Sequence, residues 1–131
     1  MALRGIRGAT TADANESETI VAATQQLLEE MIRVNSIDPE EVALAYFTTT
    51  VDLNEQFPAL AARRLGWSHV PLLCGHEMEV PTSNPLSIER CIRVVILYNT
   101  ERPASQMQFV YQRGALAIRH EVEQMRDALK R

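Results

Sequence analysis

Lysine is almost absent from this 131-residue chain, which has twelve Arg but a single Lys, Lys130, against 17 acidic residues. The formal net charge is −4, and basic residues form no cluster along the chain. A nucleic-acid or anionic-membrane surface needs many cations on one face, so neither partner is expected. Arg offers a rigid planar fork that matches carboxylates and phosphates, whereas Lys is the usual solubilising cation. On composition alone, the imbalance indicates a codon or lineage bias.

Cysteines and long apolar runs are also scarce. Cys74 and Cys91 are the only cysteines, and the N-terminus lacks the charged-then-apolar layout of a signal peptide. We therefore expect free thiols in a reducing cytoplasm. No apolar run approaches the roughly 18 residues of a membrane span. A chain of this length buries about two-thirds of its unfolded surface, so one domain over residues 1–131 folds without a disulfide or metal.

Sequence signatures of metal, cofactor and nucleophile chemistry are missing. The three histidines, His69, His76 and His120, do not have metal-ligand spacing. The sequence contains no nucleophile elbow or Walker loop, and Gly5 and Gly8 do not form a dinucleotide fingerprint. We expect no metal, no cofactor and no covalent intermediate.

The pattern that is present is several strands around one long helix. Apolar residues at helical spacing predict a helix ending near Asn35, with Asn15 or Ser17 as its N-cap. The other expected elements are strands over 3–10, 42–50, 69–74 and 90–100, a short helix within 54–66, a loop over 80–87 and a polar helical tail over 121–131. Residues 107–118 fit either a strand or a helix. This layout predicts an α+β fold, with a mixed β-sheet packed by one long helix.

The strand over 90–100 is almost continuously apolar, which is typical of a central strand covered on both faces. Arg93 interrupts it, and a buried guanidinium is costly unless an anion meets it. A salt bridge to a nearby glutamate is one answer; the candidates are Glu77, Glu79 and Glu89.

Arg7 favours a different answer, because it also lies in a predicted strand and has small neighbours. Two arginines borne by the sheet indicate a pocket for an anion with more than one charge. Glu77 could accept a hydrogen bond from a substrate hydroxyl or be an exposed loop carboxylate. Cys74 is expected to be a small buried hydrophobe.

Five segments in one order along the chain carry a family resemblance. They are RGIRGATT (4–11), DLNEQFPALAARRLGW (52–67), VPLLCGHEMEV (70–80), CIRVVILYNT (91–100) and VYQRGALAIR (110–119). Together they resemble the small monofunctional chorismate mutases of the trimeric, barrel-like class. The resemblance implies a domain core over about 2–119 and a C-terminal tail over 120–131.

That family rearranges chorismate to prephenate, a Claisen rearrangement on the shikimate route to phenylalanine and tyrosine, without a cofactor. The resemblance implies a homotrimeric pseudo-α/β barrel in the cytoplasm, with active sites in clefts between neighbouring subunits. Chorismate is a dicarboxylate, so bidentate arginines suit it.

The resemblance also implies roles for individual residues. Arg93 corresponds to the cation that meets the ether oxygen, where negative charge grows in the transition state. Arg7 and Tyr111 correspond to groups that hold a substrate carboxylate, and Glu77 and Cys74 to positions near the ring hydroxyl. The apolar walls correspond to Phe57, Ala59, Leu72, Leu73 and Ile118, and the rim arginines to Arg63 and Arg119.

Two positions depart from the family pattern. Leu60 follows the FPA triplet where some relatives carry a Lys, so electrostatic help from that position is absent. After Arg119 the chain continues His-Glu-Val-Glu instead of an Arg-Pro-Asp-like ending.

Two other functions remain as alternatives. One is a trimeric enamine or imine deaminase that binds carboxylates through interfacial Arg, although a signature for positioning a hydrolytic water is missing. The other is a non-catalytic trimeric ligand-binding module, which would bind a ligand without turnover.

Overall fold

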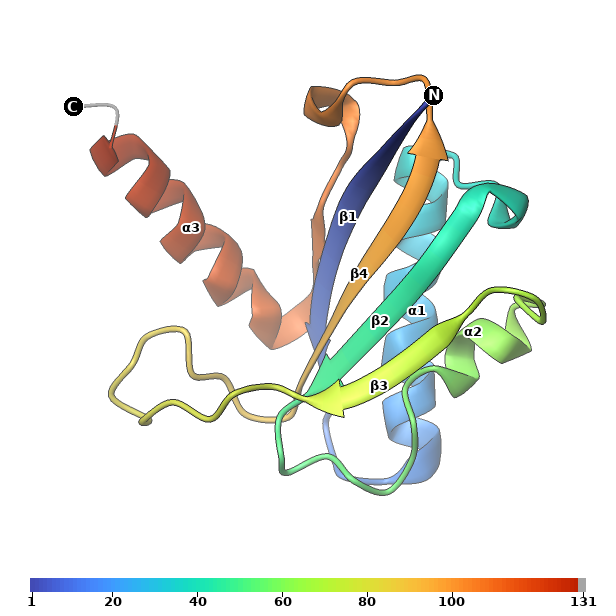
Figure 1. Cartoon of the computed structure of the whole chain (residues 1–131). Coiled ribbons are helices and arrows are strands. Elements are labelled where there is room, and N and C mark those ends of the chain that lie inside the picture. Colours follow the sequence, from blue (N-terminus) through green and yellow to red (C-terminus); the bar gives the residue numbers. More distant parts are fainter. Residues whose placement is uncertain (130–131) are drawn as a thin grey trace.

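A five-stranded mixed sheet forms the centre of the computed structural model, which describes residues 1–129 (Figure 1). The strand order is β3-β2-β4-β1-β5. The elements are β1 (Ala2–Thr11), α1 (Ser17–Asn35), β2 (Val42–Thr49), α2 (Leu60–Arg64), β3 (Leu72–His76), β4 (Cys91–Thr100), β5 (Val110–Tyr111) and α3 (Leu116–Leu129). Strand β4 pairs antiparallel with β1 and β2, whereas β2 with β3 and β1 with β5 are parallel. The expected α+β fold is confirmed.

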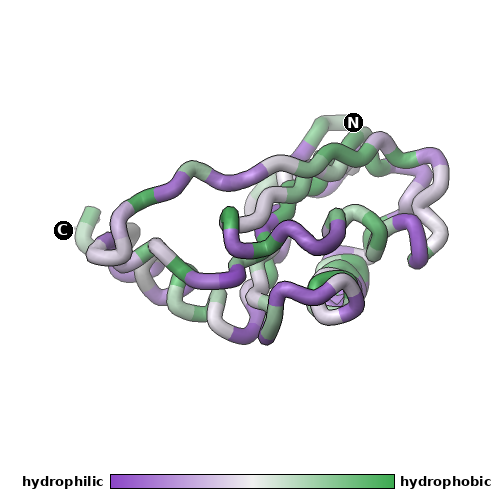
Figure 2. Tube along the Cα trace, turned by 90° about the horizontal axis from the view of Figure 1, so that it is seen from below, coloured by the Kyte–Doolittle hydropathy of each residue, from purple (hydrophilic) through white to green (hydrophobic). Residues whose placement is uncertain are grey.

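Helix α1 covers one face of the sheet (Figure 1). Its apolar stripe includes Leu27 and Met31, which are fully buried against alternate residues of the strands such as Ile6 and Phe47. The approach is close at Gly8, where an added Cβ would overlap the Met31 side chain. In Figure 2, α1 is seen nearly end-on beside the strands, and both carry hydrophobic stretches.

The opposite face of the sheet is largely uncovered. On β4 the residues facing α1 are buried, whereas Arg93, Val95, Leu97 and Asn99 are only half-buried. At one end of this face, Ala9 and Cys91 pack under Ile118 of α3. The prediction that the 90–100 strand is covered on both faces is therefore wrong within this chain.

The predicted N-cap of α1 is also wrong. Glu16 occupies the cap position and its side chain makes no cap hydrogen bond. The Asn15 side chain instead accepts hydrogen bonds from the backbone N–H groups of Asn54 and Glu55, at 3.0 and 3.2 Å. These bonds join two loops and keep residues 54–57 non-helical. The short helix predicted within 54–66 is therefore limited to α2.

The edges of the sheet follow the sequence pattern. Pro71 directly precedes β3, which is an edge strand, as predicted. The chain turns at Gly66, whose φ of +93° suits glycine.

The ambiguous stretch 107–118 divides into β5, a short turn and the start of α3. Residues 130–131 of the predicted tail lie outside the described residues. No helix in the described range is long and apolar enough to cross a bilayer.

Candidate active site

The uncovered face of the sheet carries a pocket of about 290 Å³ lined by Arg7, Glu77 and Arg93. Strand pairing brings the two arginines together, because Arg7 lies opposite Val95 and Ala9 lies opposite Arg93. Successive side chains alternate between the faces of a strand, so Arg7 and Arg93 share the open face. Two strands distant in sequence thus place two guanidinium groups and one carboxylate around a single hollow.

Arg93 is held by its own chain on two sides. Its Nη1 atom lies 3.3 Å from a Glu77 carboxylate oxygen, and its Nη2 atom donates to the Leu86 carbonyl at 3.4 Å. The side chain is 22% exposed, yet its buried Nε–H group has no partner within residues 1–129. The salt bridge to Glu77 that the sequence offered as one explanation is therefore present, and one guanidinium N–H group is left without a partner among the described residues.

Arg7 is exposed and contributes to none of the ion pairs between described residues. Tyr111 lies in β5 opposite Ala9, next to the same strand, and is half-buried. An exposed cation beside a half-buried one suits a dianion, because one carboxylate can stay near solvent while the other end of the ligand is desolvated.

A second hollow of about 430 Å³ lies between α2 and β3. Its lining includes Cys74, which was predicted near the ring hydroxyl, and the predicted wall and rim residues Phe57, Ala59, Arg63, Leu72 and Leu73. Phe57 is 69% exposed and Leu73 is 59% exposed, which is unusual for large apolar side chains of one small domain. No residue lines both this hollow and the Arg7–Arg93 pocket. A third pocket shares Phe57 and Cys74 with this hollow and His76 with the Arg7–Arg93 pocket, so the three adjoin along β3. Tyr111, Ile118 and Arg119 line neither of the first two.

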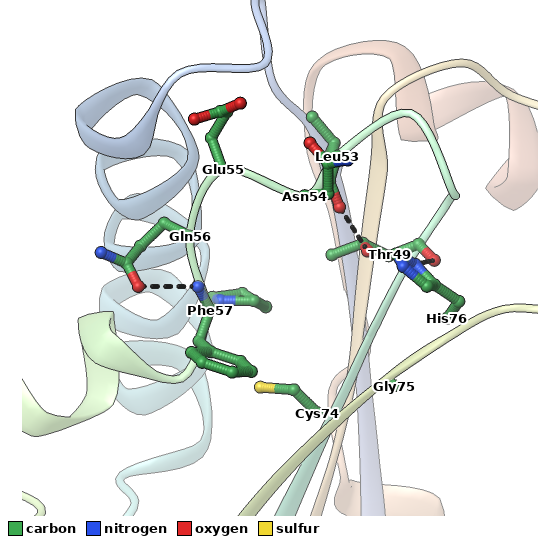
Figure 3. Close-up of a pocket in the computed structure, with 10 residues that line it drawn as sticks. Thr49, Leu53, Asn54, Glu55, Gln56, Phe57, Cys74, Gly75 and His76 are labelled. Atoms are coloured by element: carbon green, nitrogen blue, oxygen red, sulfur yellow. Dashed lines mark hydrogen bonds between the residues drawn. The ribbon is translucent and has the colours of Figure 1, made fainter.

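A neighbouring pocket of about 370 Å³ also has Phe57 and Cys74 in its wall (Figure 3). The Cys74 sulfur points toward the Phe57 ring in Figure 3. Burial raises the pKa of the Cys74 thiol, and a backbone hydrogen bond with Ala59 offsets part of this increase. Cys74 is therefore a neutral thiol at pH 7, as expected for a small hydrophobe.

Three predicted site residues make contacts within the chain. Arg63 Nη1 donates to the carbonyls of Trp67 and Val70, and so ties α2 to the segment before β3. Arg119 pairs with Glu123 at 3.1 Å on α3. Ile118 is 3% exposed and packs in the cluster under α3, so it lines neither hollow.

The sequence interpretation missed the polar floor of the Arg7–Arg93 pocket. Tyr46, Thr48 and His76 also line this pocket. Alternation along the predicted strand over 42–50 places Tyr46 and Thr48 on one face. Their position beside Arg93 depends on the register between β2 and β4, which the sequence does not specify. Among the described residues, no group of three or more His, Cys, Asp or Glu could hold a metal ion.

Comparisons with known proteins agree with one another. A model of chorismate mutase type I matches residues 3–122. Chorismate mutase AroH of Thermus thermophilus is 44% identical over 122 residues, covering 92% of this chain and 97% of that relative. Chorismate mutase AroH of Bacillus subtilis (strain 168) is 40% identical over 120 residues, covering 91% of each. A solved chorismate mutase from Clostridium thermocellum superposes with a TM-score of 0.81 at 42% identity, over 86% of this chain and 96% of that one.

Proposed function

The chain belongs to the chorismate mutase type I family, and from this membership we propose how its residues rearrange chorismate. The protein is a chorismate mutase, an isomerase that converts chorismate to prephenate in aromatic amino acid biosynthesis. The deaminase and the non-catalytic module are not favoured. The observation that carries the proposed site is the placement of Arg7, Glu77 and Arg93 around one pocket.

Arg93 is the group that favours the transition state over the substrate. Breaking the ether bond of chorismate builds negative charge on the ether oxygen, and a fixed cation in a partly dry pocket stabilises that charge. The contacts to Glu77 and the Leu86 carbonyl orient the guanidinium before the substrate arrives, and its Nε–H group has no partner among the described residues.

Arg7 and Tyr111 bind a carboxylate, and Glu77 accepts a hydrogen bond from the ring hydroxyl. These contacts hold chorismate in the compact conformer in which the bond-forming carbons meet. The reaction transfers no proton, so positioning and electrostatics are sufficient.

The complete site forms between neighbouring copies in a homotrimer. One copy supplies the Arg7–Arg93 pocket, and the next supplies the apolar wall around Phe57 and Leu73. The exposure of Phe57 and the half-covered face of β4 support this arrangement, because a neighbouring copy would cover both. Arg63 and Arg119 stand at the rim, and Ile118 supports the wall from α3.

The remaining parts of the proposal concern the setting. The two cysteines are free thiols, which supports a reducing cytoplasm. Strands from distant parts of the chain share one sheet and one core, which supports a single domain over 1–131. The absence of a Lys at Leu60 leaves Arg63 as the nearest cation of that wall.

A subunit-mixing experiment tests the shared site. Arg93→Ala and Phe57→Ala chains are each expected to be nearly inactive, because each damages every site in its own trimer. Refolding them together at equal ratio should restore about a quarter of wild-type activity, since each mixed trimer contains one site built from two intact halves. Chorismate consumption gives the activity, and light scattering should give three times the 14.8 kDa chain mass.

The control is a mixture of Arg93→Ala with an Arg93→Ala, Phe57→Ala double variant, which contains no intact pair. No restoration in the first mixture, while both parents are inactive and trimeric, would show that each site lies within one chain.

A further inference from the structure

Four buried side-chain atoms lack a hydrogen-bond partner within residues 1–129: Thr10 Oγ1, Thr48 Oγ1, Arg93 Nε and Gln112 Oε1. A buried polar atom without a partner destabilises a folded protein, and native proteins contain few of them. Each such atom therefore needs an explanation, and a bound ligand is one.

Two of these atoms belong to residues that face each other in the sheet. Thr48 of β2 pairs directly with Arg93 of β4, and both residues are on the open face. Both also line the pocket that contains Arg7 and Glu77. The unpartnered Thr48 hydroxyl and the unpartnered Arg93 Nε–H group thus belong to two paired residues that line the same pocket.

On the side of Thr48 away from β4, the neighbouring strand β3 has a glycine, Gly75, and the Tyr46 side chain occupies the space above it. Gly75 pairs with Thr48, and a Cβ added to Gly75 would lie 2.7 Å from the Tyr46 hydroxyl oxygen. Tyr46 therefore leans across Gly75. No hydrogen bond among the described residues joins Tyr46 to Thr48, so the Thr48 hydroxyl remains without a partner.

We propose that Thr48 is a further substrate-binding residue, whose hydroxyl donates a hydrogen bond to an oxygen of chorismate bound beside Arg93. This inference rests on the proposed active site. Chorismate carries carboxylate, ether and hydroxyl oxygens, all of which accept hydrogen bonds. Bound chorismate would give hydrogen-bond partners to both Thr48 Oγ1 and Arg93 Nε. The free-energy penalty of these two unpartnered atoms would then be removed only in the substrate complex.

The variant Thr48→Val tests this, because valine keeps the branched shape and removes only the hydroxyl. We expect kcat/KM to fall about tenfold, while the melting temperature stays unchanged or rises. Thr48→Ser restores the hydroxyl and should keep kcat/KM within about threefold of wild type. A purely structural threonine would instead lose stability together with activity.

Thr10→Val is the matched control. Thr10 is also fully buried with an unpartnered hydroxyl, but it shares the face of β1 that carries Gly8 and packs on α1. Its loss of a hydroxyl should leave kcat/KM unchanged and should not lower the melting temperature.

Three results would overturn the inference: a loss below threefold in Thr48→Val, an equal loss in Thr10→Val, or a loss in Thr48→Ser as large as in Thr48→Val. If Thr48→Val does not fold, Thr48→Ala compared with Thr48→Ser tests the same hydroxyl. Arg93→Ala, measured alongside, separates failure of the proposed active site from failure of the role of Thr48. A silent Arg93→Ala overturns the proposed site, whereas an inactive Arg93→Ala with a silent Thr48→Val overturns only the role of Thr48.

Discussion

The two faces of the sheet differ in what they bury. The face under α1 holds fully buried apolar residues such as Ile6, Phe47 and Ile96. The opposite face holds Arg7, Arg93 and unpartnered polar atoms in a half-exposed setting. Alternate residues of the same strands face the two sides, so the apolar core and the proposed active site are built from alternating positions of the same strands. The charged side chains of the sheet's open face depart from ordinary core packing, and such departures are where function is expected.

The largest effect should come from the closed face. Phe47→Ala removes a fully buried ring from the core, and the free energy of unfolding should fall by about 3 to 5 kcal/mol. Urea unfolding measures this loss, and kcat/KM of the remaining folded enzyme should change little. Val95→Ala, a smaller truncation on the open face, is the comparison. If it costs as much stability as Phe47→Ala, the two faces do not differ in the way described.

On the open face, Arg93→Ala should reduce kcat by a factor equivalent to about 3 to 4 kcal/mol, as for removal of one preorganised donor. Urea unfolding should show little loss of stability, because the residue is paired with a single carboxylate that is itself 38% exposed. Arg93→Lys keeps the charge but not the fork, and should recover only part of the rate. An Ala variant within about tenfold of wild type, roughly 1.4 kcal/mol, contradicts the assigned role.

Arg7→Ala should act mainly on KM. Arg7 is exposed, and it forms no ion pair with another described residue, so its guanidinium is available to a substrate carboxylate. Loss of a charged hydrogen bond should raise KM by about 10- to 100-fold with a smaller change in kcat. Steady-state kinetics separate the two constants. A decrease in kcat alone would show that Arg7 acts in the transition state and not in binding.

The smallest effect concerns the thiol at the edge of the sheet. Burial raises the pKa of Cys74 above its ordinary value, so the protonated form, which does not react with alkylating agents, persists to higher pH. The rate of iodoacetamide labelling should therefore keep increasing at pH values where that of a free cysteine has levelled off. Cys74→Ser provides the background from Cys91, which is 1% exposed. Labelling that follows the free-cysteine profile would mean that Cys74 is solvated.

The sequence predicted most of the fold and part of the site. Helical spacing predicted α1, and the apolar run from 90 to 100 predicted β4, because both patterns arise from burial against one core. Charged residues in predicted strands singled out Arg7 and Arg93, with Glu77 as a candidate partner, and the resemblance added their roles; the structure brings all three to one pocket.

The remaining features depend on contacts that spacing along the chain does not specify. Asn15 was expected to cap a helix, but its side chain bonds the loop at 54–55. Arg63 lines the hollow between α2 and β3, and the sequence did not indicate that it also bonds two nearby carbonyls. Thr48 has no distinguishing sequence feature, and only the register opposite Arg93 draws attention to it.

The contact between Tyr46 and the bare backbone of Gly75 has an evolutionary consequence. A side chain at position 75 would displace the Tyr46 hydroxyl, since a Cβ there would lie 2.7 Å from its oxygen. The present position of the Tyr46 ring therefore requires glycine at 75, whereas a shorter residue at 46 frees position 75 to carry a side chain. In an alignment of relatives, these two positions should vary as a pair, with size lost at one whenever it is gained at the other.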